Sequence, residues 1–434
     1  FFIGGNMKYY GRICHDLSDI TDEKILKTLP GVTIVNDKYK CNQCTNTDQR
    51  MFYHYYCYHC NKETIYCRSC IQLGKVQSCK NIYVIESHRE ETSGYFKLDF
   101  KLSPQQELAS QKVSEAILSH SPLLLHAVTG AGKTEMIFEG ISQARRKGYN
   151  VAVVSPRVDV VKEVYLRLKQ AFVDEQIDLL YEGQFAKFNS TFIVSTVHQL
   201  MRYYQHFDVV IVDEVDAFPL EMDNQLMTTI SKATRIQSSH IYLTATPNKQ
   251  LRSLFKEHQI ITLPARYHGH PLPVPEFHYN IVKTTKINHK LLKFFKRQVN
   301  ENRKTFVFFH DINYMESVFK LYTQYFSKIE CVSSQDPERH EKVSRLRNNE
   351  VDIMFTTTIL ERGVTLPALD VVVIRTDMFT SSAIIQIAGR VGRKTSNPTG
   401  NVICYNKGIT KEMDLARKEI MSMNKLAKER GWLK

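Results

Sequence analysis

Residues 126–135 read HAVTGAGKTE, in which two glycines precede a lysine and a threonine. Gly130 and Gly132 permit tight turns that direct backbone N–H groups at phosphate oxygens, Lys133 can neutralise terminal phosphates, and Thr134 can hold magnesium. The alternative is an ordinary glycine turn beside a lysine. The run LLLHA before the loop predicts a strand, and TEMIFEGISQARRKG after it predicts a helix. That context is the one a phosphate-binding loop requires.

Two acids end the apolar run FDVVIVDEVD at residues 207–216. A buried parallel strand would place Asp213 and Glu214 at the carboxyl edge of the sheet, beside the phosphate loop. Asp213 can bind magnesium through water, and Glu214 can orient and deprotonate an attacking water. Asp216 is expected to support local structure or an interdomain contact. An acidic strand end alone is often a solvated cap, but together with the loop it predicts nucleotide hydrolysis.

A third group is QIAGRVGR at residues 386–393. Arg390 and Arg393 are three residues apart, which predicts that they share one helical face with small residues between them. An arginine delivered across a cleft can stabilise charge that develops on a γ-phosphate. The alternative interpretation is a basic surface helix.

Seven of the ten cysteines lie between residues 41 and 79 and include three C-x2-C pairs. In a reducing compartment this spacing favours zinc over disulfides, because each short loop brings two thiolates to one tetrahedral ion. Buried reduced cysteines are the alternative. The predicted ligands are Cys41, Cys44, Cys57, Cys60, Cys67 and Cys70, with Cys79 as a further candidate.

The spacing leaves the pairing of these cysteines open. A sequential site would use the first two pairs, and a crossed site would join Cys41 and Cys44 to Cys67 and Cys70. Two sites would form if Cys79 and a histidine, His59 or His88, completed the second. We expect most aromatic residues of MFYHYYCYHC to fill the small core of this segment, with stacking on unpaired bases as the alternative.

The whole chain has 434 residues, 43% of them hydrophobic, and a net charge of +13. This composition argues against disorder and favours a polyanionic partner. No window approaches the roughly 18 uninterrupted apolar residues of a membrane helix, so we expect a soluble, cytoplasmic protein. Residues 1–7, FFIGGN and the following methionine, are interpreted as a tag or vector remnant.

Strand-like runs alternate with amphipathic stretches after residue 98, which predicts parallel sheets with helices on both faces. Four prolines in PARYHGHPLPVPE mark a linker between two such domains. The predicted domains are an N-terminal zinc-binding domain at 8–98, an ATP-binding domain at 99–266, a linker at 267–276 and a second α/β domain at 277–434.

These motifs in this order resemble superfamily 2 helicases and translocases over about residues 100–410. Members of that superfamily commonly carry alanine at the position of Ala127. The resemblance implies two tandem RecA-like domains behind the zinc-binding one, and a DNA-dependent ATPase that uses ATP, Mg²⁺ and Zn²⁺. Thr365 stands where an acid is frequent, whereas Gln386 and the sequence DEVD favour DNA over RNA.

The resemblance also assigns residues to sites. The catalytic residues implied are Lys133, Asp213, Glu214, Arg390 and Arg393. The ATP-binding residues implied are Gln106, Ala127, Thr129, Gly130, Ala131, Gly132, Lys133, Thr134, Gly363 and Gln386, and magnesium is assigned to Thr134 and Asp213. The DNA-binding residues implied are Pro156, Arg157, Thr196, His198 and Thr357, and the coupling residues are Thr244 and Thr246.

Within this superfamily the chain is most similar to the late-competence ATPases of the ComFA family of Gram-positive bacteria, which place a cysteine-rich segment before a compact helicase core. That resemblance implies a motor that pulls single-stranded DNA through a membrane channel during transformation. It further implies a phosphoribosyltransferase-like partner and recruitment to the inner face of the membrane, and it leaves an oligomer open. The alternatives are a primosomal-type helicase in replication restart, an ATP-switched single-stranded DNA-binding adaptor and an RNA-unwinding enzyme.

Overall fold

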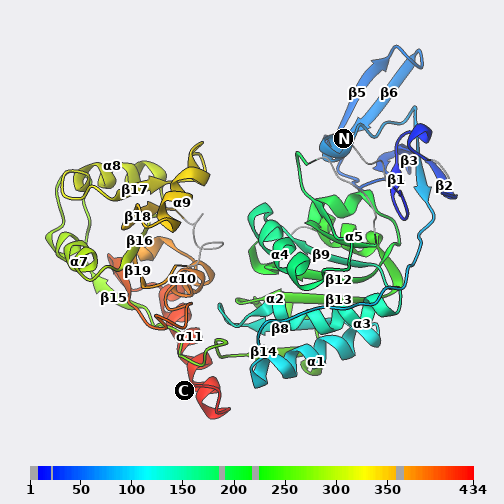
Figure 1. Ribbon diagram of the computed structural model, residues 1–434. Coiled ribbons are helices and arrows are strands. Elements are labelled where there is room, and N and C mark those ends of the chain that lie inside the picture. Colours follow the sequence, from blue (N-terminus) through cyan, green and yellow to red (C-terminus); the bar gives the residue numbers. More distant parts are fainter. Residues whose placement is uncertain (1–7, 21–22, 185–190, 218–223, 358–365) are drawn as a thin grey trace. The chain divides into compact units, whose positions relative to one another are not determined.

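A computed structural model describes residues 8–20, 23–184, 191–217, 224–357 and 366–434. Its internal contacts divide the chain into two units. The first unit contains the residues up to His126 and Lys133–Thr262, and the second contains Ala127–Gly132 and Leu263–Lys434. Figure 1 labels the helices and strands of both units.

A seven-stranded sheet forms the centre of the first unit. Its strands, in spatial order, are β10 (Asp178–Leu180), β11 (Phe192–Thr196), β9 (Val151–Ser155), β12 (Phe207–Asp213), β13 (Thr234–Thr244), β8 (Leu123–Ala127) and β14 (Ile260–Leu263). The pairings from β10 to β8 are all parallel. Every residue of β8, β9, β11 and β12 is buried, as expected for strands that helices cover on both faces.

The helices of the first unit are α1 (Pro104–Leu118), α2 (Lys133–Met136), α3 (Phe138–Arg146), α4 (Val158–Ala171), α5 (Asn224–Ala233) and α6 (Lys249–Ser253). Pro104 occupies the first turn of α1, where its missing N–H costs nothing, and the Gln106 side chain accepts a 2.9 Å hydrogen bond from the Ser103 N–H. Figure 1 shows α1 and α3 side by side on one face of the sheet.

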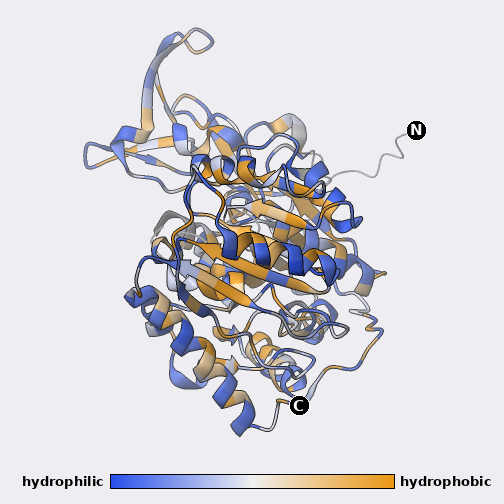
Figure 2. Cartoon of the chain, turned by 90° about the vertical axis from the view of Figure 1, so that its left-hand side faces the viewer, coloured by the Kyte–Doolittle hydropathy of each residue, from blue (hydrophilic) through white to orange (hydrophobic). Residues whose placement is uncertain are grey.

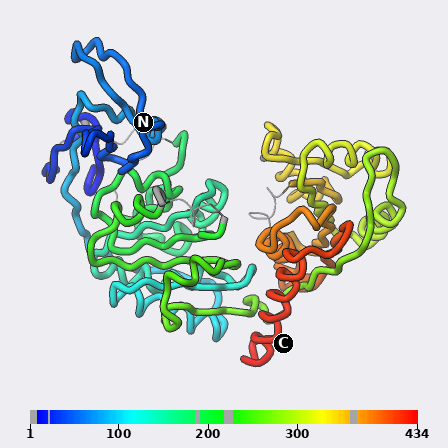
Figure 3. Tube along the Cα trace, turned by 180° about the vertical axis from the view of Figure 1, so that it is seen from behind, coloured from blue at the N-terminus to red at the C-terminus, as the bar shows by residue number. Residues whose placement is uncertain are grey.

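The cysteine-rich segment consists of short antiparallel strands. Its strands are β1 (Ile13–Cys14), β2 (Ile25–Pro30), β3 (Val32–Val35), β4 (Lys38–Cys41), β5 (Phe52–Cys57), β6 (Lys62–Cys67) and β7 (Asn81–Ile85). They form a three-stranded sheet in the order β1-β7-β2 and two hairpins, β3-β4 and β5-β6. The β5-β6 hairpin projects from the rest of the unit (Figures 1 and 3).

This segment shares one hydrophobic core with the first parallel sheet. Cys41, Cys44, Cys67 and Cys70 belong to the same buried cluster as residues of α5 and of the 3-10 helix η4 (Val197–Arg202). Because η4 and α5 supply this packing, the segment needs less filler of its own. The expectation that its aromatic residues mostly fill a core is accordingly wrong for Tyr53, Tyr56 and Tyr58, which are 53%, 46% and 86% exposed.

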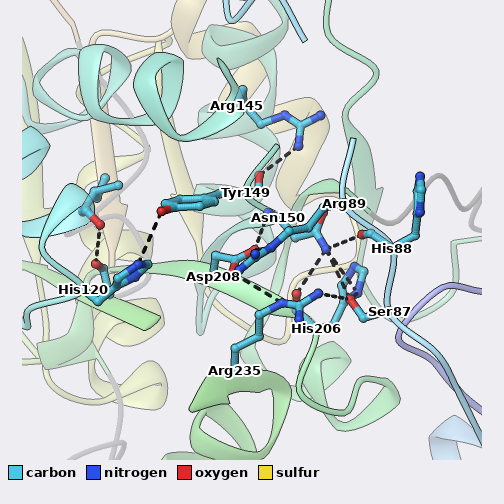
Figure 4. Close-up of polar contacts among 12 residues, drawn as sticks. Ser87, His88, Arg89, His120, Arg145, Tyr149, Asn150, His206, Asp208 and Arg235 are labelled. Carbon is cyan, nitrogen blue, oxygen red and sulfur yellow. Dashed lines mark hydrogen bonds and ion pairs between the residues drawn. The ribbon is translucent and has the colours of Figure 1, made fainter. Parts of the chain in front are cut away.

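An extended connector, residues 86–97, links the segment to α1 along the first sheet (Figure 1). Arg89 pairs with the fully buried Asp208 of β12, and Arg235 Nε lies 3.4 Å from the same carboxylate. The Asn150 N–H also donates to Asp208 at 2.9 Å. Figure 4 shows these groups converging with Ser87 and His206. Two guanidinium groups and a backbone amide thus neutralise one buried charge.

The second unit is built on a six-stranded, wholly parallel sheet. Its strands, in spatial order, are β15 (Glu276–Tyr279), β20 (Val402–Asn406), β19 (Leu369–Ile374), β16 (Lys304–Phe308), β18 (Ile353–Thr356) and β17 (Ile329–Val332). Its helices are α7 (His289–Asn300), α8 (Ile312–Tyr322), α9 (Arg339–Arg347), α10 (Ser381–Ala388) and α11 (Lys411–Glu429).

Both units therefore confirm the predicted α/β class with parallel sheets. Figure 2 shows apolar strands, in orange, covered by helices that carry hydrophilic residues. In the part of the chain that the structure describes, no helix combines the length and apolar character needed to cross a bilayer.

The buried ion pairs of Asp208 make a testable contribution to stability. Asp208→Asn leaves Arg89 and Arg235 without their countercharge, and we expect a loss of about 2 to 3 kcal/mol of unfolding free energy. This is below the value for a fully buried pair, because the Arg89 side chain is 45% exposed. Urea unfolding followed by circular dichroism measures it. The control, Glu115→Gln, breaks an exposed pair with Lys112 and should cost under about 1 kcal/mol; equal effects would contradict the assignment.

Candidate functional site

The predicted phosphate loop follows β8 directly. Gly130 and Gly132 have φ angles of +82° and +77°, a region that side chains disfavour, so glycine is required at both positions. The Ala131 N–H donates to the Val128 carbonyl at 3.1 Å and closes the turn, and α2 begins at Lys133. Ala127, Thr129 and Ala131 are buried, whereas Lys133 and Thr134 are partly exposed.

Residues 263–267 brace this loop through its backbone. The Val128 N–H donates to the Leu263 carbonyl at 3.1 Å, and the Tyr267 N–H donates to the Gly130 carbonyl at 3.1 Å. Nothing in the local pattern of the sequence indicates these two hydrogen bonds, because they join segments more than 130 residues apart.

The acidic pair stands at the end of β12. Asp213 is 8% exposed, and burial, together with the nearby Glu214 carboxylate, raises its pKa to about 6, while Lys133 acts in the opposite direction. The structure thus brings Lys133 into electrostatic range of Asp213, as the sequence predicts. A buried carboxylate among other acids fits a divalent cation, whose charge would keep it ionised. Asp213 and Thr134 are the residues that would hold magnesium.

Glu214 has a left-handed backbone conformation, with φ at +54°. Its N–H donates to Asp213 Oδ1 at 2.8 Å, which helps to compensate the strain of this conformation. A non-glycine residue with positive φ at the end of a buried strand is a sign of a functional position.

Asp216 is bound by the motif TATP, residues 244–247. Thr244 Oγ1 donates to Asp216 Oδ1 at 2.8 Å, and Thr246 Oγ1 donates to the other carboxylate oxygen. The Thr246 N–H also donates to Thr244 Oγ1 at 3.0 Å. Of the two roles expected for Asp216, local support is the one that these hydrogen bonds show.

Sequence reasoning did not identify His126, the last residue before the loop in the first unit. It is fully buried, and burial together with the adjacent Arg252 lowers its pKa to about 3, so the imidazole is neutral. Arg252 Nη2 lies 2.6 Å from Nδ1, which makes Nδ1 the acceptor and leaves Nε2–H to donate to the Ala245 carbonyl at 3.2 Å. His126 thereby ties β8 to the TATP segment.

The predicted DNA-binding residues occupy different environments. Pro156 is buried, and Arg157 is partly exposed and pairs with Asp159 at 2.9 Å. Thr196 is buried at the end of β11, while His198 is exposed on η4. The fifth, Thr357, is partly exposed just after β18.

The remaining nucleotide-binding predictions are also distributed over both units. Gln106 is buried in α1, and Gln386 is buried in α10. Gly363 lies outside the described residues.

The expectation that Arg390 and Arg393 share one helical face is wrong. Helix α10 ends at Ala388, with Gly389 as its C-cap, and both arginines lie in the following turn, where Gly392 has a φ of +65°. Arg390 is 2% exposed, and Arg393 Nε donates to the Gly389 carbonyl at 2.8 Å. That these arginines meet the triphosphate bound by Lys133 stays a prediction.

Residues 266–268, at the boundary of the predicted linker, contact this arginine turn inside the second unit. Arg266 Nη1 donates to the Gly392 carbonyl at 2.9 Å, and His268 Nε2 lies 3.0 Å from the same oxygen. The Tyr267 hydroxyl donates to the Arg393 carbonyl at 3.2 Å. Residues 266–268 are therefore positioning residues for the turn, and no sequence motif marks them.

Four cysteines form one buried cluster. Cys41 Sγ lies 3.6 Å from Cys70 Sγ, and Cys44 Sγ lies 3.7 Å from Cys67 Sγ. A tetrahedral zinc with Zn–S bonds of about 2.3 Å requires about 3.8 Å between sulfurs, so the cluster fits zinc. The crossed arrangement is present, and the sequential one is not.

The other predicted ligands, Cys57, Cys60 and Cys79, form a separate group. Among the described residues, neither His59 nor His88 belongs to either group.

A lysine of α5 contacts the loop that carries the first cysteine pair. Lys232 Nζ donates to the Asn42 carbonyl at 2.7 Å and to the Gln43 carbonyl. Burial lowers its pKa to about 8, while nearby thiols, Cys41 among them, oppose that shift. A cation here compensates the negative charge of four thiolates around one zinc ion.

Three family descriptions match consecutive parts of the chain. "Competence protein ComFA N-terminal domain" matches residues 11–84, "Type III restriction enzyme, res subunit" matches 99–249, and "Helicase conserved C-terminal domain" matches 286–395. The chain is 39% identical to the competence protein ComFA of Bacillus subtilis (strain 168), with 91% of this chain and 88% of the relative covered. It is 34% identical to ComFA of Streptococcus pneumoniae, with 97% and 99% covered.

The chain belongs to the ComFA family. It is a competence-related, helicase-like ATPase, and its helicase domains imply ATP and Mg²⁺. A solved structure, "S. cerevisiae Dbp5 bound to RNA and ADP BeF3", matches with a TM-score of 0.54 at 14% identity, over 74% of this chain and 91% of that one. This likeness confirms the tandem RecA-like fold.

The raised pKa of Asp213 predicts a pH-dependent cost. The folded state binds a proton at the Asp213 carboxyl more tightly than the unfolded chain does. Above pH 6 the ionised carboxylate therefore lowers the stability of the folded state. Below pH 4 the carboxyl group is mostly protonated, so this cost is absent. In the absence of nucleotide and metal, Asp213→Asn should therefore stabilise the folded chain by about 2 to 3 kcal/mol at pH 8, with no gain at pH 4. In a separate assay with ATP and Mg²⁺, the same variant should show no ATP hydrolysis. Urea unfolding at both pH values measures the stability. Asp208→Asn, in the same strand, should destabilise at pH 8; stabilisation by both would contradict this account.

The four-cysteine cluster predicts a structural zinc ion. Cys44→Ser should remove one zinc ion per chain and lower the thermal unfolding midpoint, because the cluster lies in the core shared with η4 and α5. Elemental analysis of the purified protein and calorimetry give the two readouts. Cys404→Ala, which alters another buried cysteine outside the cluster, should leave the zinc content unchanged. Full zinc content in Cys44→Ser would refute the assignment.

Proposed function

We propose that this ComFA protein is an ATP-driven motor that binds single-stranded DNA, hydrolyses ATP in response and drives uptake of transforming DNA. Family membership supports the competence role. The observation that carries the motor is the pair of hydrogen bonds from Thr244 and Thr246 to Asp216, because it links the acidic motif to the end of the neighbouring strand.

In this proposal Lys133 binds the terminal phosphates and Glu214 orients the attacking water. Asp213 and Thr134 hold magnesium, which supplies charge neutralisation at the transferring phosphoryl group. Arg390 and Arg393 stabilise the charge that develops on the γ-phosphate, as their motif predicts. Loss of the γ-phosphate changes the charge beside Asp213 and Glu214, and so acts on the segment that contains Asp216.

The hydrogen bonds from Thr244 and Thr246 to Asp216 transmit the change at the nucleotide to the segments that bind DNA. Residues of TATP stand between the acids and the phosphate loop, because β13 lies between β12 and β8. A shift of Asp216 therefore moves the end of β13 relative to both neighbours. A motor needs such a two-state element that nucleotide biases.

Positive charge and exposed aromatic rings support single-stranded DNA as the partner. The net charge of +13 favours a polyanion, and Arg157, Thr196, His198 and Thr357 are the proposed contacts to its backbone. Tyr53, Tyr56 and Tyr58 are exposed on the projecting hairpin. Lys75 Nζ lies 3.6 Å from the centre of the neighbouring Tyr55 ring. Rings interleaved with cations suit unpaired bases, which can stack on them.

The assembly around the motor rests on the family resemblance. We propose that a phosphoribosyltransferase-like competence partner and a membrane DNA channel recruit the protein to the inner face of the membrane.

ATP turnover titrated with single-stranded DNA, duplex DNA and RNA of equal length tests the proposal. We expect single-stranded DNA to stimulate turnover most. Lys133→Ala and Glu214→Gln should each lower the stimulated rate about 100-fold or more and leave binding of labelled single-stranded DNA largely intact. Lys112→Ala, which removes an exposed charge on α1, should behave as the parent. Equal turnover with and without DNA would refute the motor, and stimulation by RNA alone would favour RNA unwinding.

A further inference from the structure

Three cysteines outside the buried four-cysteine cluster converge on one point. The sulfur atoms of Cys57, Cys60 and Cys79 all lie within 4.8 Å of one another, and all three are free thiols. Sulfurs so spaced surround a point at most about 2.8 Å from each, so shifts of about 0.5 Å would reach the Zn–S distance of about 2.3 Å. Among the described residues, no fourth cysteine, histidine or acid joins the group.

The backbone delivers these thiols from two directions. Cys57 ends β5 and pairs with Lys62 at the start of β6, so Cys57 and Cys60 flank the tip of the hairpin. The Cys60 N–H donates to the Cys57 carbonyl at 3.2 Å. A tight C-x2-C turn brings two thiolates toward one point, which suits a metal ion.

The third thiol belongs to Cys79, which directly follows residues 76–78. These residues run antiparallel to β6. The Cys67 N–H donates to the Val76 carbonyl at 3.0 Å, and the Ser78 N–H donates to the Ile65 carbonyl at 2.8 Å. This direction carries the chain from the base of the hairpin toward its tip, where Cys79 meets the turn.

Hydrophobic packing does not account for three cysteines at the tip of this hairpin. Cys60 and Cys79 are partly exposed, unlike the four buried sulfurs of the other cluster, and the neighbouring Tyr58 is 86% exposed. A two-stranded hairpin that projects from a fold is marginally stable without further contacts (Figures 1 and 3). An ion shared by the tip and Cys79 would supply that contact.

We propose that Cys57, Cys60 and Cys79 bind a second zinc ion with an open fourth position, which water occupies in the isolated protein. The two ions interleave along the sequence. The first and third C-x2-C pairs share the closed ion, and the second pair shares the open ion with Cys79. Each ion therefore ties together segments that the other leaves apart.

The open position gives the second ion chemistry that the first lacks. Four thiolates saturate a tetrahedral ion, whereas three leave a position for an incoming thiolate, imidazole or chelator. The second ion is therefore the one that exchanges quickly. It also fixes the hairpin that carries Tyr53, Tyr56 and Tyr58, whether or not those rings contact DNA.

Zinc content and release rate of the full chain test the proposal. The parent should hold two zinc ions per chain, and a chromogenic chelator should remove one at least about ten times faster than the other. Cys79→Ser should hold one ion and lose the fast phase, while Cys44→Ser should lose the slow phase. The control Cys331→Ser, a partly exposed cysteine in the second unit, should retain both ions. One ion in the parent, or two in Cys79→Ser, would overturn the proposal.

Cobalt substitution separates loss of a ligand from loss of folding. The thiolate-to-cobalt absorbance should correspond to seven Co–S bonds in the parent and to four in Cys79→Ser and Cys57→Ser, with an unchanged circular dichroism spectrum. Equal absorbance in the parent and both variants would contradict the second site. So would a disulfide among Cys57, Cys60 and Cys79 in parent protein purified under reducing conditions, which mass spectrometry under non-reducing conditions detects.

Discussion

Parallel pairing of β8, β13 and β12 is the constraint on which the nucleotide site depends. Thr244 pairs with His126 and Asp213 pairs with Leu243, so each of these strands ends within one residue row of its neighbour. Because parallel strands all point the same way, the phosphate loop, the TATP motif and the acids emerge at one edge. The side-chain bonds of Asp216 and His126 then fix the TATP segment to both neighbours. Strand order therefore brings these motifs to one edge of the sheet, and the two left-handed glycines shape the phosphate loop.

The cysteine-rich segment is an integral part of the first unit in packing terms. Its four-thiolate cluster lies in one core with η4, which carries His198, and with α5, which follows the acidic motif. Lys232 adds a polar contact from α5 to the loop at Asn42. This integration explains why so small a segment can leave several tyrosines exposed.

Local signals in the sequence predicted what local chemistry determines. The glycines of the phosphate loop, the apolar strand before Asp213 and the alternation of strands and helices each have a physical cause within about ten residues, and the parallel α/β fold followed. The crossed cysteine pairing could not be predicted, because all three C-x2-C loops have equal spacing. The end of α10 could have been predicted, since Gly389 and Gly392 are a helix stop signal that the arginine spacing obscured. The contacts of Arg266 and His268 join distant segments, so no local pattern reveals them.

The two buried aspartates of β12 differ in whether positive charge surrounds them, and this difference distinguishes a structural carboxylate from a functional one. Asp208, near the start of the strand, is enclosed by Arg89, Arg235 and a backbone amide. Asp213, at its end, has Glu214, Asp216 and Lys133 as charged neighbours, and its pKa is raised because burial is not matched by positive charge. Arginine side chains therefore neutralise the buried carboxylate at the start of β12, Asp208, but not the one at its end, Asp213. At the other end burial is not matched by positive charge, which fits a carboxylate that would hold a magnesium ion.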